Sequence, residues 1–328
     1  MVANEFLLAP GTPPDDWDQP LAFVDLAQWP DASALPSSPP FPIIGLGDRR
    51  HPIAATLDAV IESPVSADML IREISANPLA AAVTVQLLRA IETASLESAL
   101  VLESLAYGLL QGSEEHAAWA ARQTVFGGAA GPGKVAIARQ EDVLSIVIDR
   151  PDARNAIDRP IRDSLFEAFT LAALDRDIRS VRLRSTGPAF SIGADLTEFG
   201  TTRDPATAHW IRGRTLPAHA ILGCADRLDV HVQGACIGAG LEIAAFARRL
   251  TASGNAWFQL PELAMGLLPG AGGCVSVSRR IGRQRAALMI LSGRRIAAAT
   301  ALAWRLIDAI EDDVAADEGG ADPIGGQI

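Results

Sequence analysis

The sequence predicts a mixed α/β domain preceded by a mainly helical N-terminal region, and three observations support this. Across residues 66–123, apolar residues recur at three- and four-residue steps, as on one face of an amphipathic helix. From residue 143 onward, short apolar strand-like segments alternate with helical ones, which is typical of an α/β core. The glycine-rich stretch Thr124–Lys134 lies between the two regions and has the composition of a linker. We therefore expect residues 1–133 to form an N-terminal extension and residues 134–310 to form the α/β core.

The N-terminal extension begins with a proline-rich stretch over residues 1–42. Proline fixes φ and removes a backbone donor, so we expect an extended arm with little helix here. Residues 41–47 are expected to form a short strand that ends in a glycine turn, and two to four helices should follow within residues 66–123. At the other end of the chain, residues 311–328 form an acidic, Gly-rich tail that we expect to be disordered.

The α/β core has recognisable strand and helix candidates in alternation. Its predicted strands are Val143–Ile148, Val181–Leu183 and Leu228–Val232. Its predicted helices are Pro160–Leu174, a segment from the glycines near residue 240 to Arg248, Ala271–Ile281 and Arg285–Leu291.

Composition limits the classes of function that the chain can have. A net charge of −11 over 328 residues argues against nucleic acid as a partner. Lys134 is the one lysine, so a ligand phosphate would be met by arginines or by backbone N–H groups. The three cysteines show no CxxC spacing, so neither a disulfide framework nor a metal site is expected. We find no signal peptide and no apolar run that could span a membrane, and we expect a cytoplasmic protein.

Four segments of the second half carry groups suited to chemistry. They are Asp149–Ile157, Gly187–Leu196, Val232–Ala244 and Phe258–Gly273. The second and third place glycines and small residues at strand ends, where backbone N–H groups can face an anion. In the third, the predicted helix also presents the positive end of its dipole.

Glu242 and Glu262 stand out because each lies among apolar neighbours in the third and fourth segments. An ionised carboxylate in such surroundings is unfavourable unless it is paired, and burial would raise its pKa toward a value useful for proton transfer. The residues alone leave two interpretations open: an acid/base pair, or glutamates that lie on the surface or pair with an arginine.

In their order and spacing, the four segments resemble the enoyl-CoA hydratase/isomerase (crotonase) superfamily, over a little more than half of the chain. The resemblance implies a spiral of repeated ββα units. It also implies an acyl-CoA thioester substrate, of which coenzyme A is a part, and no separate cofactor or metal. A homo-oligomer, either a trimer or a dimer of trimers, is implied as well.

The resemblance assigns roles to individual residues of this chain. Backbone N–H groups of Ile192 and Ala239 would form the oxyanion hole that holds the thioester oxygen. Glu242 and Glu262 would be the catalytic acid/base pair around one water. The family commonly has a small residue where Ile192 stands, so the isoleucine side chain is expected to reshape the pocket.

Substrate and CoA contacts are also implied by the resemblance, with alternatives for two of them. The residues concerned are Arg154, Ala156, Ser191, Asp195 and Gly238. Arg154 could approach the nucleotide phosphates or simply be a solvated arginine ahead of a helix. Asp195 could cap its own turn.

Retention of both glutamates favours an enoyl-CoA hydratase of fatty acid metabolism, which reversibly adds water to a trans-2-enoyl-CoA through an enolate. Double-bond isomerisation or another acyl-CoA reaction is the alternative among enzymes, and a non-catalytic acyl-CoA-binding scaffold is the alternative outside them. In the family, several helices follow the segment that corresponds to Ser292–Ile310. We expect the N-terminal helices to supply part of that missing lid or oligomer surface, unless they form a separate partner-binding domain.

Overall fold

The computed structural model describes most of the 328-residue chain. It covers residues 4–10, 17–30, 39–122, 131–202 and 204–311. The expected linker at residues 124–134 lies mostly outside these ranges, and so does all but the first residue of the expected acidic tail 311–328.

The N-terminal region contains a small parallel sheet followed by four helices. The sheet has the order β1-β2-β3 and comprises β1 (Ala22–Asp25), β2 (Ile43–Leu46) and β3 (Ala59–Val60). The helices are α1 (Ala67–Ala76), α2 (Pro78–Ile91), α3 (Leu96–Gln111) and α4 (Glu114–Arg122). The helices and the strand expected within residues 41–47 are confirmed. The prediction of an extended arm missed β1, which is short and pairs with a strand far along the chain.

A six-stranded sheet forms the frame of the α/β core. Its order is β12-β9-β7-β6-β5-β4, and every neighbouring pair is parallel except β4 with β5. The strands are β4 (Lys134–Gln140), β5 (Val143–Asp149), β6 (Ser180–Ser185), β7 (Leu228–Val232), β9 (Arg249–Ala252) and β12 (Ala309–Ile310). Helices α5 (Arg159–Leu174), α6 (Pro205–Thr215) and α7 (Pro217–Ile221) come from the connections between these strands. Burial alternates along β5, so the sheet packs one face against α5 and leaves the other more open.

A second, three-stranded sheet and four further helices complete the core. The sheet has the order β11-β10-β8, with β8 (Ala235–Ile237), β10 (Trp257–Gln259) and β11 (Ile296–Ala297). The helices are α8 (Ala239–Ala244), α9 (Gly273–Ile281), α10 (Arg283–Ser292) and α11 (Ala298–Ala303).

The predicted core elements are found at nearly the predicted positions, with one clear error. The helix expected to run to Arg248 ends at Ala244, because the next residues turn and enter strand β9 at Arg249. A strand cannot begin directly from a continuing helix, so the apolar periodicity overestimated the length of α8.

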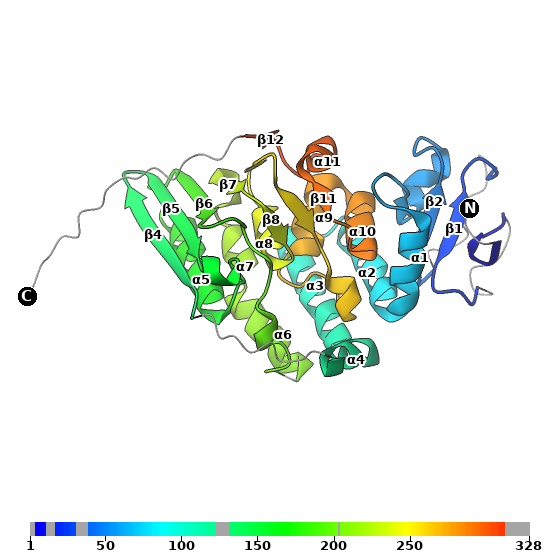
Figure 1. Cartoon of the computed structure of the whole chain (residues 1–328), viewed down its shortest axis with the longest axis horizontal. Helices are drawn as coiled ribbons and strands as arrows, with labels where there is room; N and C mark the ends of the chain where they lie inside the picture. Colours follow the sequence, from blue (N-terminus) through cyan, green and yellow to red (C-terminus); the bar gives the residue numbers. More distant parts are fainter. Residues whose placement is uncertain (1–3, 11–16, 31–38, 123–130, 203, 312–328) are drawn as a thin grey trace, which may run out of the picture.

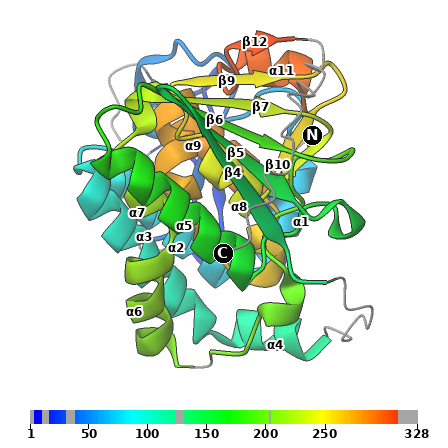
Figure 2. The ribbon, with the colours of Figure 1, turned by 90° about the vertical axis from the view of Figure 1, so that its left-hand side faces the viewer.

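The N-terminal helices pack directly on the core. In Figure 1, α9 and α10 lie between the N-terminal strands β1 and β2 and the large sheet. Figure 2 shows α2 and α3 on the same side of the molecule as α5 and α7. A single cluster of buried apolar side chains runs through both regions and includes Leu88 of α2, Leu100 of α3 and Val275 of α9. Where the two regions divide remains a prediction, but their hydrophobic cores are continuous.

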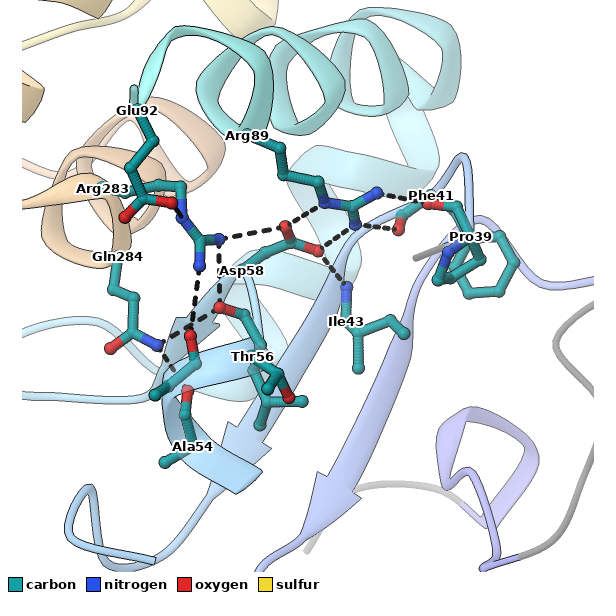
Figure 3. A network of polar contacts seen from close by, with 12 residues as sticks. Pro39, Phe41, Ile43, Ala54, Thr56, Asp58, Arg89, Glu92, Arg283 and Gln284 are labelled. Atoms are coloured by element: carbon teal, nitrogen blue, oxygen red, sulfur yellow. Dashed lines mark hydrogen bonds and ion pairs between the residues drawn. The ribbon is translucent and has the colours of Figure 1, made fainter. Parts of the chain in front are cut away.

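A buried ion network also joins the two regions (Figure 3). Asp58, which is 2% exposed, forms a two-point contact with Arg89 of α2, at 2.7 Å and 2.5 Å. Arg283, at the start of α10, approaches the same carboxylate at 3.5 Å and donates to Glu92 at 3.0 Å. The network therefore fastens α10 to the N-terminal sheet and to α2.

No single helix within the described ranges is long and apolar enough to cross a membrane. Helices α1 and α2 meet the length and composition criterion only as a pair, and the pair is bent by 109°.

Candidate active site

Glu242 lies in α8 and is held by the beginning of another helix. Its side chain is 2% exposed, and its Oε2 accepts backbone N–H groups of Ala271 at 2.6 Å and Gly273 at 2.8 Å. Burial raises the pKa of Glu242 to about 7, although these two hydrogen bonds favour the charged form and oppose the rise. A carboxyl group with this pKa can accept or release a proton near neutral pH.

Glu262 lies in a short 3-10 helix, η7 (Glu262–Met265). Its Oε2 is buried and has no hydrogen-bond partner in the described part of the chain. Burial raises the pKa of Glu262 well above its usual value, and the negative charge of Glu242 raises it further. The two carboxyls therefore differ in their hydrogen bonding: Glu242 is held by two backbone N–H groups, whereas Oε2 of Glu262 has no partner among the described residues.

The backbone at the start of α8 lies against the loop that contains Ile192. Gly238 adopts a φ of +47°, and a Cβ built on it would lie 3.7 Å from Cα of Gly193 and 2.7 Å from Oε1 of Glu262. A side chain at position 238 would thus be strained and would collide with the carboxylate. The turn brings the loop, the start of α8 and Glu262 together.

The N–H groups of Ile192 and Ala239 border this turn. Ala239 is the first residue of α8, so its N–H has no acceptor within the helix. The Ile192 N–H forms no hydrogen bond with any described residue. One N–H without an acceptor lies in the Ile192 loop and the other at the start of α8, which fits the expected oxyanion hole. The role of the hole remains a prediction.

The other predicted contact residues lie around this centre, and most are occupied by structural bonds. The Ser191 hydroxyl is buried and donates to the backbone oxygen of Asn155 at 2.7 Å. Asp195 caps its own turn through Thr197 and forms an ion pair with Arg150 at 2.7 Å. Burial opposes ionisation of Asp195, but hydrogen bonds from Thr197 and Arg150 hold its pKa below the usual value. Contacts of Ser191 and Asp195 with a ligand remain predictions.

Arg154 and Ala156 come from the turn that follows β5. Arg154 is exposed and has left-handed backbone dihedral angles, with a φ of +51°. Ala156 is buried, and its backbone oxygen accepts from Arg150 at 3.1 Å. An exposed arginine here is free to meet an anion, so the two interpretations of Arg154 both remain open.

Sequence reasoning missed Asn155, which braces the Ile192 loop. Asn155 is fully buried, and its Nδ2 donates to the backbone oxygens of Thr186 at 2.6 Å and Ala189 at 2.8 Å. Its Oδ1 accepts the Arg150 N–H at 2.8 Å. The available signal was an asparagine in the turn that follows a predicted strand, because such a side chain often bonds to nearby backbone.

Two residues of α3 at the site were also missed. Glu103 is 1% exposed, and its Oε1 accepts the N–H of Gly272 at 2.7 Å. Tyr107 is one helical turn further along and packs against Gly270, where a Cβ would come within 2.2 Å of the ring. Both come from the N-terminal region, where no sequence motif marked a functional residue.

His231 and Asp229 have structural contacts outside the candidate site. His231 is buried and bonds with Thr251 and Ser253, and Asp229 pairs with Arg248. The cysteines are buried, which raises the pKa of each thiol. Among the described residues, no three His, Cys, Asp or Glu side chains are arranged to hold a metal.

A hollow of about 190 Å³ lies on the open side of the large sheet, but it shares no residue with the glutamate site. It is lined by Arg182, Arg184, Asp229, Val230, His231, Arg249, Thr251 and Glu311. Because its arginines are accompanied by two carboxylates, the hollow does not compete with the glutamate centre as a candidate active site.

Comparison with known proteins agrees with this arrangement. The model of the enoyl-CoA hydratase/isomerase family matches residues 138–317, which is more than half of the chain. The chain therefore belongs to the enoyl-CoA hydratase/isomerase family, and its core has the crotonase fold.

Two curated relatives are hydratases of different acyl-CoA substrates. The mevalonyl-coenzyme A hydratase of Beauveria bassiana is 32% identical over 179 residues, which cover 52% of this chain and 64% of that protein. The 2,3-dehydroadipyl-CoA hydratase of Escherichia coli is 33% identical over 168 residues, which cover 49% of this chain and 63% of that protein. The chain thus spans a little under two thirds of the length of these relatives.

Solved structures show the same partial match. A Mycobacterium abscessus protein, assigned as an enoyl-CoA hydratase/isomerase, matches with a TM-score of 0.51 and 34% identity. That match covers 55% of this chain and 71% of that one. A Thermobifida fusca protein, assigned as an enoyl-CoA hydratase and solved with acetoacetyl-CoA, has a TM-score of 0.50 and 26% identity. That match covers 55% of this chain and 74% of that one.

Proposed function

We propose that the protein is an enoyl-CoA hydratase that reversibly adds water to a trans-2-enoyl-CoA. The observation that carries the proposal is the pair Glu242 and Glu262. Glu242 is buried and held by two backbone N–H groups, Glu262 is half-buried with a buried Oε2 that has no hydrogen-bond partner among the described residues, and the pKa of each is raised. Relatives with hydratase names and a structural relative solved with acetoacetyl-CoA support an acyl-CoA thioester as the substrate.

The two glutamates would divide the proton transfers of hydration. Glu242, which ionises near neutral pH and is fixed by two backbone N–H groups, accepts a proton as water oxygen bonds to the β-carbon. Electron density moves from the double bond onto the thioester oxygen as an enolate, and protonated Glu262 then delivers its proton to the α-carbon. A proton passed back from Glu242 to Glu262 restores the pair, so the net change is addition of one water.

The N–H groups of Ile192 and Ala239 would stabilise the enolate oxygen. Preorganised amide donors are most effective where charge develops in a site shielded from water. The beginning of α8 adds the positive end of a helix dipole on the same side. In this proposal no redox or metal cofactor takes part, and the chain works as a cytoplasmic homo-oligomer.

The proposal is tested by incubating the full chain with crotonyl-CoA and following the loss of the conjugated enoyl absorbance. Glu242→Gln and Glu262→Gln should each lower kcat by roughly 10²–10⁴-fold, because each removes one proton-transfer group. Binding of acetoacetyl-CoA should remain close to that of the wild type, since neither substitution removes the amide donors.

Other outcomes would assign the protein elsewhere. Migration of the double bond in a 3-enoyl-CoA without hydration of a 2-enoyl-CoA would identify an isomerase. Binding of acyl-CoA without turnover of either substrate would identify a non-catalytic scaffold.

A further inference from the structure

Glu103 reaches the proposed active site from the N-terminal helices. It lies on α3 and is 1% exposed. Its two oxygens accept backbone N–H groups of Gly272 at 2.7 Å and Val275 at 3.3 Å, at the beginning of α9. The bond to Gly272 joins residues 169 positions apart in the chain. A carboxylate from one region therefore caps a helix of the other.

Glu103 and Glu242 share this helix beginning in an interleaved way. Glu242 accepts from Ala271 and Gly273, whereas Glu103 accepts from the residue between them. Successive amides thus point alternately to the core carboxylate and to the N-terminal one. A shift of the turn would disturb both carboxylates, so Glu103 fixes the amides that orient Glu242.

The surroundings of Glu103 show that its charge is not neutralised by an ion pair. No lysine, arginine or histidine in the described ranges forms a salt bridge with it. Arg212 of α6 is the nearby cation, but its guanidinium donates to Ser104 at 2.9 Å and Gln111 at 2.8 Å and lies over the Tyr107 ring. A neutral cap would serve the helix at lower electrostatic cost, because a charge on Glu103 disfavours ionisation of Glu262.

The titratable groups that influence this centre come from five packed elements. Glu103 and Tyr107 come from α3, Arg212 from α6, Glu242 from α8, Glu262 from η7, and Cys274 from α9. Burial raises the pKa of Glu103 well above its usual value, and Glu242 raises it further. The carboxyls therefore titrate as an interacting set.

We infer that Glu103 is a positioning residue of the proposed hydratase site, which orients the α9 turn that holds Glu242 and places a third carboxyl group beside it. The inference rests on the proposed function for its kinetic consequences. Its structural basis, the interleaved hydrogen bonds, is independent of which acyl-CoA reaction is catalysed. The N-terminal region would thereby take part in setting the reactivity of the core.

The test compares Glu103→Gln with wild type, with Glu97→Gln as the matched control. Glu97 lies on the same helix but is exposed. Replacing Glu103 by neutral Gln removes one of the charges that raise the pKa of Glu262, so Glu262 should ionise more readily. The high-pH limb of the profile of kcat/KM for crotonyl-CoA should then move to lower pH by roughly one unit, while the low-pH limb stays in place. The profile of Glu97→Gln should match that of the wild type.

Glu103→Asp tests the positioning part separately. It keeps the charge but shortens the reach to Gly272. The pH limbs should stay at the wild-type positions, while kcat falls by about tenfold and KM changes by less than about twofold. This variant also serves if Glu103→Gln does not fold.

A carbon-13 NMR titration of the glutamate carboxyls separates this inference from the proposed function. The Glu262 signal is assigned as the one lost in Glu262→Gln, and it should titrate at lower pH in Glu103→Gln. If the wild type hydrates no enoyl-CoA but this shift is seen, the proposed function is wrong and the role of Glu103 stands. An unmoved high-pH limb and an unmoved Glu262 titration in a folded Glu103→Gln protein would overturn the inference.

Discussion

The N-terminal region meets the core at two buried acidic junctions that are built in opposite ways. At the first, Asp58 forms ion pairs with Arg89 and Arg283, which come from helices on either side of it (Figure 3). At the second, Glu103 and Glu242 approach one helix beginning, and no basic residue of the described chain forms an ion pair with either. Both junctions bury carboxylates, but only the first compensates them with positive charge.

The difference separates a structural junction from a reactive one. Removing one partner from a buried ion pair with bidentate arginine contacts is strongly destabilising. Carboxyls that share only backbone amides have raised pKa values, and the pKa of about 7 lets Glu242 exchange a proton near neutral pH. The lack of a basic partner, rather than the presence of acids, distinguishes the candidate active site from the Asp58 network.

The largest expected effect is at the first junction. Asp58→Ala should lower the free energy of unfolding by about 3–5 kcal/mol, because it leaves two half-buried arginines without their shared buried carboxylate. Urea denaturation at pH 7 measures this. A loss below about 1 kcal/mol would show that the network does not stabilise the contact between the regions.

At the second junction, replacing the carboxyl of Glu242 should raise the free energy of unfolding, whereas Asp58→Ala should lower it. The pKa of Glu242 is raised from 4.5 in the unfolded chain to about 7 in the folded one. Its contribution to stability is therefore complete below about pH 4.5 and is lost as the pH rises through 7. Glu242→Gln should accordingly be more stable than the wild type by roughly 2–3 kcal/mol at pH 8.

The same comparison at pH 4 supplies the control for Glu242→Gln. There the wild-type side chain is protonated in both states, so the gain should disappear. Urea denaturation at the two pH values measures the difference, and an equal effect at both would contradict the assigned cause.

A smaller effect is expected from weakening, without removing, the Asp58 pair. Arg89→Lys keeps the charge but replaces a two-point contact by one. The free energy of unfolding should fall by about 1–2 kcal/mol. A loss as large as that of Asp58→Ala would mean that geometry, and not charge, accounts for most of the stabilisation.

The smallest effect is expected at a surface ion pair of similar length. Arg72 and Glu73 are 2.8 Å apart, but the Arg72 side chain is 66% exposed. Arg72→Gln should change the free energy of unfolding by less than about 0.5 kcal/mol, because water screens the pair. Thermal denaturation of Arg72→Gln and Asp58→Ala under the same conditions measures the difference. A much smaller loss for Arg72→Gln would show that burial, rather than the distance between the charges, sets the size of the effect.

The fold class and most core elements could be predicted because their signals are local. Helix α5 has apolar residues at helical spacing, and β5 alternates between buried and less buried positions. Short strands such as β1 and β9 carry too few residues for such a pattern, and their existence depends on partners distant in sequence. The length of α8 was overestimated because the short strand β9, which begins soon after it, was not recognised.

The candidate site could be predicted only in part. Glu242 and Glu262 were identifiable because a carboxylate among apolar neighbours is unusual, and the glycine-rich segments around them have a recognisable order. Glu103 could not be identified in this way, since it lies in a helix whose sequence resembles many others. Its role depends on a contact with Gly272 across the fold, and a single sequence does not reveal contacts at such a separation.

The interleaved amides at the beginning of α9 have a consequence for how the protein folds. The turn at residues 271–275 takes hydrogen-bond acceptors from both regions, and those regions are far apart along the chain. Closing so long a loop is entropically unfavourable, so we expect this turn to form late in folding. During refolding, catalytic competence should therefore return only after α3 has docked, even when the large sheet is already complete.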